Sequence, residues 1–238
     1  MEWLRADYTE VWTTADNAPL VRFADRVEAI SSTGLDLLEL GLPQWGAPDA
    51  TRLRGFDSIV SWYGGSRQSF RDAVRGLPFV FHAALPTDDT RHAVDFYLAQ
   101  VDAPPGAVPR VPVERHSGDY LAIHPFSGSA RKNWPLDRFQ AVADRLGVAV
   151  QWSAGPDEHL PGARRFGDRY QLARWLAGAR CYLGNDSGVS HLAAAVGTPV
   201  VAIFGPTNPA VWAPRGDRVR VLLEPDVDSA TCAVLDCM

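Results

Sequence analysis

Short apolar runs alternate with amphipathic segments along the chain, which is the pattern of an α/β protein with parallel strands. In the C-terminal half this pattern predicts strands at residues 120–124, 148–153 and 200–204, and a further strand that ends with residues 181–183. Helices are predicted over residues 136–146 and 189–196. In the N-terminal half, shorter strand-like runs lie at residues 10–14, 26–30, 58–63 and 79–82.

Proline residues cluster near the middle of the chain. Residues 102–119 hold four of the 18 prolines, a composition typical of a linker between domains. We place the linker at residues 105–118, between an N-terminal domain at 1–104 and a C-terminal domain at 119–238. With 238 residues, of which 46% are hydrophobic and 21% charged, the chain has enough material for two small globular domains.

The net charge and the distribution of apolar residues argue against some classes of function. A net charge of −5 argues against non-specific binding to nucleic acid, which requires a basic surface. No run of about twenty apolar residues appears, and the N-terminus lacks the features of a signal peptide. We therefore expect a cytoplasmic protein, with a peripheral position at the inner membrane as an alternative.

The segment 184–209, GNDSGVSHLAAAVGTPVVAIFGPTNP, places a polar turn between an apolar strand and an alanine-rich helix. Ser187 is the expected N-cap of that helix, whose first backbone N–H groups lack partners and attract anions. Gly188 allows a ligand to approach the backbone, and His191 follows Ser187 by one helical turn. The segment therefore predicts a site for a phosphorylated ligand. Taken singly, each residue also fits a capped helix with a half-buried histidine.

A second loop, PFSGSARKNWP at residues 125–135, follows the predicted strand 120–124. Arg131 and Lys132 place two cations at the carboxyl end of that strand, and the compact ammonium of lysine suits a diphosphate. A solvated basic turn is the alternative. The GxxxxGK[ST] spacing of a P-loop is absent, so the loop does not indicate a nucleoside triphosphatase.

Together, HPFSGSARKNWPLDRF and GNDSGVSHLAAAVGTPVVAIFGPTNP resemble the C-terminal half of glycosyltransferase family 9, the ADP-heptose lipopolysaccharide heptosyltransferases and their relatives. Both motifs match in order, spacing and flanking structure. The resemblance implies a GT-B fold, in which two Rossmann-like domains with parallel sheets face a cleft and the C-terminal one holds the nucleotide sugar. It also implies that no metal or other cofactor is needed.

By the same resemblance, residues of both motifs would bind the donor nucleotide sugar: Ser127, Ser129, Lys132, Asp186, Ser187, Gly188 and His191. The first three would contact the diphosphate, and the others would contact the phosphates and the donor sugar. Glu158, in the turn after the strand 148–153, would hold the nucleotide ribose, although Asp157 is equally placed.

The N-terminal half offers fewer candidates. Gly64 and Gly65 open a loop after the strand 58–63, and Arg67 would bind an acidic acceptor through two hydrogen bonds, with an ordinary glycine turn as the alternative. Asp16, in the turn at residues 13–21, is expected to cap a helix.

Family members open with a strand and a glycine-rich loop whose Asp is the candidate general base. The resemblance places Met1 already in the helix after that loop, so we expect the strand and its Asp to be absent, and no catalytic residue is assigned. A sheet without that strand would expose an edge, so we expect either that a second copy of the chain covers it or that the true start codon lies further upstream. The C-terminus is also expected to be short, because family members usually finish with a helix that crosses back to the first domain.

Three cysteines give neither a disulfide framework nor a zinc site. Cys181 falls in a predicted strand and is expected in the core. Cys232 and Cys237 are expected to be free thiols in a C-terminal tail, with a pair or a shared metal as the alternative.

The resemblance implies an inverting transferase that moves a sugar, a heptose being one candidate, from a nucleotide diphosphate-sugar donor such as ADP-heptose. The acceptor would be a phosphorylated saccharide or lipid in lipopolysaccharide or cell-surface glycan synthesis. Two alternatives stay open. One is a non-catalytic member that binds a nucleotide sugar or a partner protein, and the other is a nucleotide-sugar 2-epimerase of related fold.

Overall fold

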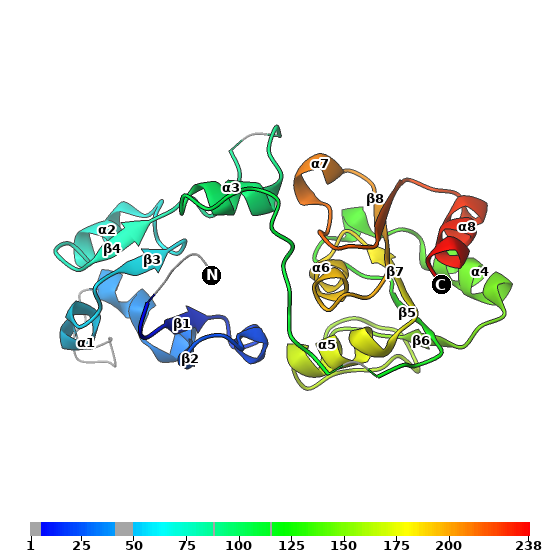
Figure 1. Ribbon diagram of the computed structural model, residues 1–238, viewed down its shortest axis with the longest axis horizontal. Coiled ribbons are helices and arrows are strands. Elements are labelled where there is room, and N and C mark those ends of the chain that lie inside the picture. Colours follow the sequence, from blue (N-terminus) through cyan, green and yellow to red (C-terminus); the bar gives the residue numbers. More distant parts are fainter. Residues whose placement is uncertain (1–5, 41–49, 88, 115) are drawn as a thin grey trace. The chain divides into compact units, whose positions relative to one another are not determined.

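A computed structural model describes residues 6–40, 50–87, 89–114 and 116–238 (Figure 1). The chain forms two compact units. The first unit contains Met1–Asp88 and Phe96–Pro104, and the second unit contains Asp89–Asp95 and Pro105–Met238. Because the short segment Asp89–Asp95 groups with the second unit, the chain passes between the units more than once.

The second unit is built on a five-stranded parallel sheet with the strand order β6-β5-β7-β8-β9. Its strands are β5 (Leu121–His124), β6 (Val150–Trp152), β7 (Cys181–Asn185), β8 (Val200–Phe204) and β9 (Val219–Leu223). The three central strands, β5, β7 and β8, are buried along their whole length, as their continuous apolar sequences predict. All five strands end at the same edge of the sheet, so the loops that follow them can form one site.

Helices cover both faces of this sheet (Figure 1). They are α4 (Leu136–Leu146), α5 (Arg169–Gly178), α6 (Gly188–Ala195), α7 (Pro209–Trp212) and α8 (Val227–Cys237), with the short 3-10 helix η4 at Ala130–Lys132. The helices α4 and α8 pack together on one face, and α5 and α6 pack together on the other. The bounds predicted for α4 are confirmed, and its apolar stripe is buried as expected.

The C-terminal residues form the helix α8 rather than the predicted tail. Asp226 caps this helix, because its side chain accepts a hydrogen bond from the Ser229 backbone N–H at 2.8 Å. Ala230, Ala233 and Val234 are buried on its inner face. The prediction of a tail was wrong because the apolar face of this helix is narrow and made mainly of small residues, which gives a weak periodic signal.

The first unit contains two separate parallel pairs of strands. The pairs are β1 (Glu10–Thr13) with β2 (Arg26–Ala29), and β3 (Ile59–Ser61) with β4 (Phe79–Phe81). Its helical segments are η1 (Ala18–Leu20), η2 (Ile30–Ser32), η3 (Leu35–Leu40), α1 (Ala50–Arg54) and α2 (Gln68–Ala73), and α3 (Ala93–Ala99) runs from the second unit into the first. All four predicted strands are confirmed, each one to three residues shorter than expected.

A small aromatic core holds the first unit together. Phe70 of α2 is fully buried, and its ring meets the rings of Tyr63, Phe79 and Phe81 edge-on. The prediction that Asp16 caps a helix was wrong, because Asn17 occupies the position before η1 and no side-chain capping bond forms there. An α/β fold with parallel strands is confirmed in both units.

Candidate functional site

The two sequence motifs meet at the carboxyl edge of the five-stranded sheet. The strands β5 and β7 are neighbours, with His124 paired to Gly184, so the loops that follow them start side by side. Across these loops Lys132 Nζ donates a hydrogen bond to Asp186 Oδ2 at 2.7 Å. The Asp186 side chain is 6% exposed and that of Lys132 is 35% exposed, so the ammonium is the part of the pair that solvent or a ligand can reach.

Asn185 joins the two motifs more firmly than this ion pair. The strand β7 runs two residues further than predicted and ends at Asn185, which is fully buried. Its Oδ1 accepts a hydrogen bond from the Trp134 backbone N–H at 2.9 Å, and its Nδ2 donates to the Pro125 carbonyl at 2.7 Å. Because these two partners bracket residues 126–133, one amide fixes both ends of the loop that carries Lys132. Sequence reasoning missed this role, although an amide at the end of an apolar strand was a signal.

The start of α6 differs in detail from the prediction. Ser187 occupies the N-cap position, but its hydroxyl makes no capping hydrogen bond. Its Oγ lies 3.5 Å from Ser190 Oγ, which donates to the Asn185 carbonyl at 2.5 Å. The backbone N–H groups of Gly188 and Val189 form no hydrogen bond with any other residue that the structure describes. Two donors at the positive end of the helix dipole therefore remain available for an anion.

The two glycines of this motif have different functions. A Cβ atom at Gly184 would lie 2.2 Å from Tyr182 Oη and 2.9 Å from the His124 carbonyl oxygen, so packing requires glycine there. A Cβ atom at Gly188 would meet nothing within 4 Å. Gly188 therefore borders open space over the helix start, where a ligand would lie.

Ser127 and Ser129 shape the loop that carries Lys132. Ser127 Oγ lies 2.7 Å from the Ser129 carbonyl and 2.8 Å from Asn133 Oδ1. Ser129 is exposed and precedes η4. The Ser127 hydroxyl is thus already engaged within the loop, whereas that of Ser129 faces solvent.

Glu158 lies at the ends of β5 and β6. Its Oε2 accepts a hydrogen bond from the Gly155 N–H at 2.5 Å and lies 3.6 Å from His124 Nε2. Burial lowers the pKa of His124, with Glu158 opposing the shift, so the ring is neutral at pH 7. Asp157, which the sequence could not separate from Glu158, is exposed.

Two histidines lie near the start of α6. His191 is exposed on α6, but desolvation by the surrounding protein lowers its pKa, against the opposing effect of Asp186. His92 comes from the segment that precedes α3, and its Nε2 lies 2.9 Å from the Ala213 carbonyl oxygen. Burial also lowers the pKa of His92. Sequence reasoning missed His92, because a residue so distant in the chain gives no local signal.

The candidates in the first unit are already engaged with their own unit. Arg67 Nη1 lies 2.6 Å from Glu39 Oε1, and its guanidinium stacks 4.6 Å from the centre of the Tyr63 ring. Gly64 has a positive φ of 74° and packs directly against Phe70. Gly65 follows in the same turn. An acidic acceptor would have to displace Glu39 from Arg67, and the acceptor role of these three residues stays a prediction.

The chain is similar to several known proteins. Residues 170–238 match the family described as "Glycosyltransferase family 9 (heptosyltransferase)". Over 255 aligned residues the chain is 26% identical to lipopolysaccharide heptosyltransferase 1 of Pseudomonas aeruginosa, and the alignment covers 95% of this chain and 69% of that protein. The chain is therefore similar to proteins of glycosyltransferase family 9. It is also 31% identical over 122 residues to lipopolysaccharide heptosyltransferase 3 of Escherichia coli K12, covering 42% of this chain and 35% of that protein.

Solved structures of the family share the fold. The structure of E. coli heptosyltransferase WaaC with ADP matches with a TM-score of 0.66 at 14% identity, and the alignment covers 97% of this chain and 90% of the WaaC chain. E. coli ADP-heptose lps heptosyltransferase II has a TM-score of 0.71 at 16% identity, with coverages of 97% and 88%. The GT-B fold predicted from the sequence is thereby confirmed. The absence of the opening strand stays a prediction.

Two further observations concern membrane-spanning helices and clusters of metal-ligating side chains. Among the described residues, no helix combines the length and the apolar character that crossing a membrane requires. Within the same residues, no three His, Cys, Asp or Glu side chains gather as metal ligands would.

Proposed function

We propose that this protein transfers a sugar from a nucleotide diphosphate donor to a hydroxyl of a phosphorylated saccharide or lipid acceptor. ADP-heptose is the donor we favour, because the relatives are named heptosyltransferases and one similar fold was solved with ADP. The observation that carries the proposal is the meeting of Lys132, Asp186 and the free start of α6 at one edge of the sheet. Neither the family match nor the relatives favour a non-catalytic binding protein.

The donor diphosphate would lie over the start of α6. There the N–H groups of Gly188 and Val189 donate to phosphate oxygens, and the open space at Gly188 admits them. The Lys132 ammonium turns from Asp186 toward the diphosphate and stabilises the charge that develops as the sugar leaves. A neutral His191 ring still offers one N–H donor to a phosphate oxygen.

The buried carboxylate of Asp186 has a different role from that of Lys132. It would repel a diphosphate placed directly against it, so we assign it to a hydroxyl of the donor sugar. It also holds the Lys132 ammonium at the site before the donor binds. Glu158 accepts a hydrogen bond from a ribose hydroxyl, with the neutral His124 beside it.

The acceptor side is assigned to the first unit. Arg67 exchanges its bond to Glu39 for an anionic group of the acceptor, next to the turn at Gly64 and Gly65. The acceptor hydroxyl attacks the anomeric carbon, its proton passes to a general base, and the nucleotide diphosphate leaves with inversion. No described residue is assigned as that base. The product belongs to lipopolysaccharide or other cell-surface glycan, made at the cytoplasmic side of the inner membrane.

A chemical feature of the sequence makes the donor site testable without the acceptor. Lys132 is the only lysine in the chain, so an amine-selective acylating reagent can modify only Lys132 and the α-amino group. We expect ADP to protect Lys132 from acetylation, read by mass spectrometry, while the α-amino group stays as reactive as before and serves as the internal control. Equal acetylation of Lys132 with and without saturating ADP or UDP would remove the donor-site assignment.

Transfer itself is tested with ADP-heptose and a phosphorylated lipopolysaccharide core acceptor, read as the mass gain of one heptose. Calorimetry on the wild type compares the affinities for ADP and UDP and so identifies the nucleotide base of the donor. Binding of neither nucleotide would contradict the proposal.

A further inference from the structure

Two of the three cysteines lie together on the side of the second unit where the strands begin. Cys181 is the first residue of β7 and is fully buried. Cys237 is the last residue of α8, is half-buried, and packs against the core cluster that contains Cys181. Cys181 Sγ donates to the Tyr182 carbonyl at 3.6 Å, and a hydrogen bond between the two thiols shifts the pKa of both. Sequence reasoning considered Cys232 as the partner of Cys237, but Cys232 is exposed on α8.

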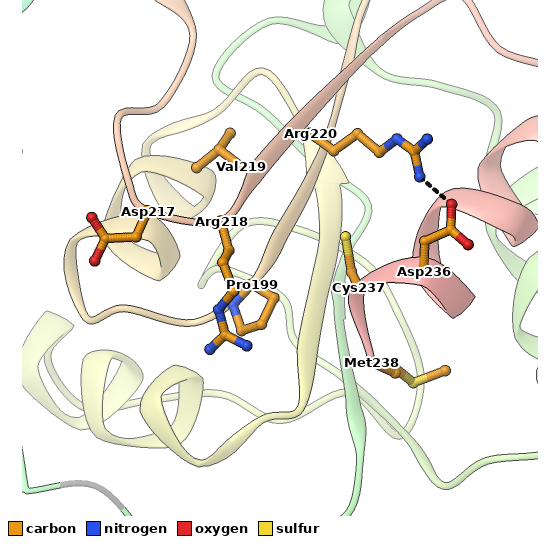
Figure 2. Close-up of a pocket in the computed structure, with 8 residues that line it drawn as sticks. All are labelled: Pro199, Asp217, Arg218, Val219, Arg220, Asp236, Cys237 and Met238. Atoms are coloured by element: carbon orange, nitrogen blue, oxygen red, sulfur yellow. Dashed lines mark hydrogen bonds and ion pairs between the residues drawn. The ribbon is translucent and has the colours of Figure 1, made fainter.

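A cavity of about 440 Å³ opens beside Cys237 (Figure 2). It is lined by residues from the end of α8, from the start of β9, and by Pro199 just before β8. Cys237 is among these residues and Cys181 is not. Cys237 therefore borders a space that a small reagent can enter, whereas Cys181 is fully buried.

The charges around the pair favour a thiolate on Cys237. The hydrogen bond with Cys181 lowers the pKa of Cys237 to about 7, and the nearby Arg220 and Arg218 add to this effect against burial and Asp236. The same hydrogen bond, with burial, raises the pKa of Cys181. Near neutral pH, Cys181 therefore keeps its proton, while Cys237 is partly ionised.

We propose that Cys237 and Cys181 form a thiol–disulfide exchange site for small acidic disulfides such as glutathione disulfide. Cys237 Sγ attacks one sulfur of the small disulfide, and the other sulfur leaves as a thiolate. Cys181 then loses its proton and attacks Cys237 Sγ, and the second small thiolate leaves. The pair is oxidised by two electrons, and the small disulfide is reduced to two thiols.

The lining of the cavity fits an anionic reagent only in part. Arg218 and Arg220 lie in it, but Asp217 and Asp236 do so too, and Arg220 pairs with Asp236 at 2.6 Å (Figure 2). Arg110 pairs with Asp217 at 3.5 Å. With both carboxylates paired, Arg218 is left as the cation that selects an acidic disulfide.

The product disulfide would tie α8 to the first residue of β7. These two elements already pack against each other, and α8 also contacts β8. The bond would therefore constrain α8 where it lies and would not require the sheet to rearrange. This inference does not depend on the proposed transferase activity.

The experiment uses the full chain, reduced and then exposed to glutathione disulfide. Free thiols are alkylated, and trypsin is added. Trypsin cuts after Arg180 and Arg220, so Cys181 lies in the peptide 181–215, while Cys232 and Cys237 share the peptide 221–238. We expect these two peptides to become joined by a disulfide in the wild type.

Three variants identify the bond. Cys232→Ser is the matched control on the same helix and should form the joined peptides as well as the wild type does. Cys237→Ser should abolish them. Cys181→Ala should also abolish them but let the mixed disulfide between Cys237 and glutathione accumulate, because the resolving thiol is gone.

Other outcomes would overturn the proposal. A wild type whose Cys237 stops at the mixed disulfide with glutathione shows that Cys181 does not resolve it. Joined peptides that disappear in Cys232→Ser show that the wrong thiol was assigned. If Cys181→Ala does not fold, the joined peptides of the wild type, Cys232→Ser and Cys237→Ser still show whether Cys237 forms the disulfide.

Discussion

The Lys132 ammonium lies 2.7 Å from Asp186 Oδ2, although the two residues are 54 positions apart in the chain. The ion pair brings the single lysine of the protein to the start of α6. At this position the ammonium has two possible anionic partners, the carboxylate and a bound diphosphate. Variants of the two residues should therefore have different effects.

Lys132→Met should weaken ADP binding by about 10-fold to 100-fold, the loss expected for one charge-assisted hydrogen bond. Lys132→Arg keeps the charge and should recover part of that affinity. Asp186→Asn should change ADP affinity only a few-fold, since it removes a charge that repels the diphosphate, but should slow sugar transfer strongly. Calorimetry and a transfer assay measure the two effects. Equal losses of ADP binding in Lys132→Met and Asp186→Asn would contradict the separate roles.

The two glycines at Gly184 and Gly188 form a matched pair. Gly188→Ala should leave the melting temperature unchanged or slightly raised, because alanine suits a helix and its Cβ meets nothing within 4 Å. The same methyl group should weaken nucleotide binding, since it occupies the space over the helix start. Gly184→Ala should instead destabilise the fold by about 1–3 kcal/mol, as expected for overpacking. Thermal melts with calorimetry on both variants test this, and an unchanged affinity in Gly188→Ala would remove the anion site from that position.

Asn185→Ala should destabilise the second unit by about 2–4 kcal/mol, because it leaves the Trp134 N–H and the Pro125 carbonyl buried without partners. Asn185→Asp retains the acceptor for Trp134 but sets a buried carboxylate against the Pro125 carbonyl, so near neutral pH it should lower the free energy of unfolding at least as much as Asn185→Ala. Asn208→Ala is a suitable control, because Asn208 also accepts a backbone hydrogen bond, from Ala210, but at an exposed helix start. Asn208→Ala should lower the free energy of unfolding by about 1 kcal/mol. Equal costs at Asn185 and Asn208 would show that the two loops do not depend on the buried amide.

Asp95 should make the stability of the second unit sensitive to acid. The hydrogen bond from Arg215, 2.7 Å from Oδ1, lowers the pKa of Asp95 to about 2 against the opposing effect of burial. Because the pKa is depressed in the folded state, the stabilisation is present above the ordinary value of 3.8 and is lost as the pH falls toward about 2.

Asp95→Asn should therefore lower the free energy of unfolding by about 1 kcal/mol at pH 7, a value reduced for the partial exposure of the pair, and by almost nothing at pH 2. Denaturant titrations at both pH values measure it. Asp119, whose side chain is 88% exposed in its pair with Arg180, is the control and should show no change at either pH. A difference for Asp95→Asn that persists at pH 2 would point to lost packing instead of the ion pair.

The transferase should not require a metal ion, because Lys132 and the start of α6 are proposed to carry the charge of the diphosphate. Extensive treatment with a chelator should leave the rate of sugar transfer unchanged. Loss of activity that Mg²⁺ or Mn²⁺ restores would show that a metal does the work assigned to Lys132.

Local patterns in the sequence predicted much of the second unit. The continuous apolar run of β8 and the apolar stripe of α4 are local signals, and both elements have the predicted bounds. The role of Asn185 and the pairing of Cys237 with Cys181 were not predictable, since each depends on which distant segments the fold brings together. His92 was missed for the same reason. The capping role predicted for Asp16 failed for a different reason. Turn chemistry decides which of two adjacent residues precedes a helix, and hydrophobic periodicity does not reveal it.

The hydrogen bonds of Asn185 have a practical consequence for engineering. They hold only the two ends of the loop, at Pro125 and Trp134, and both partners are backbone atoms. The side chains between these ends can therefore be exchanged as a cassette while the frame that positions them persists. A library confined to residues 126–133, with Lys132 and Asn185 left intact, would search for new donor preferences without challenging the fold.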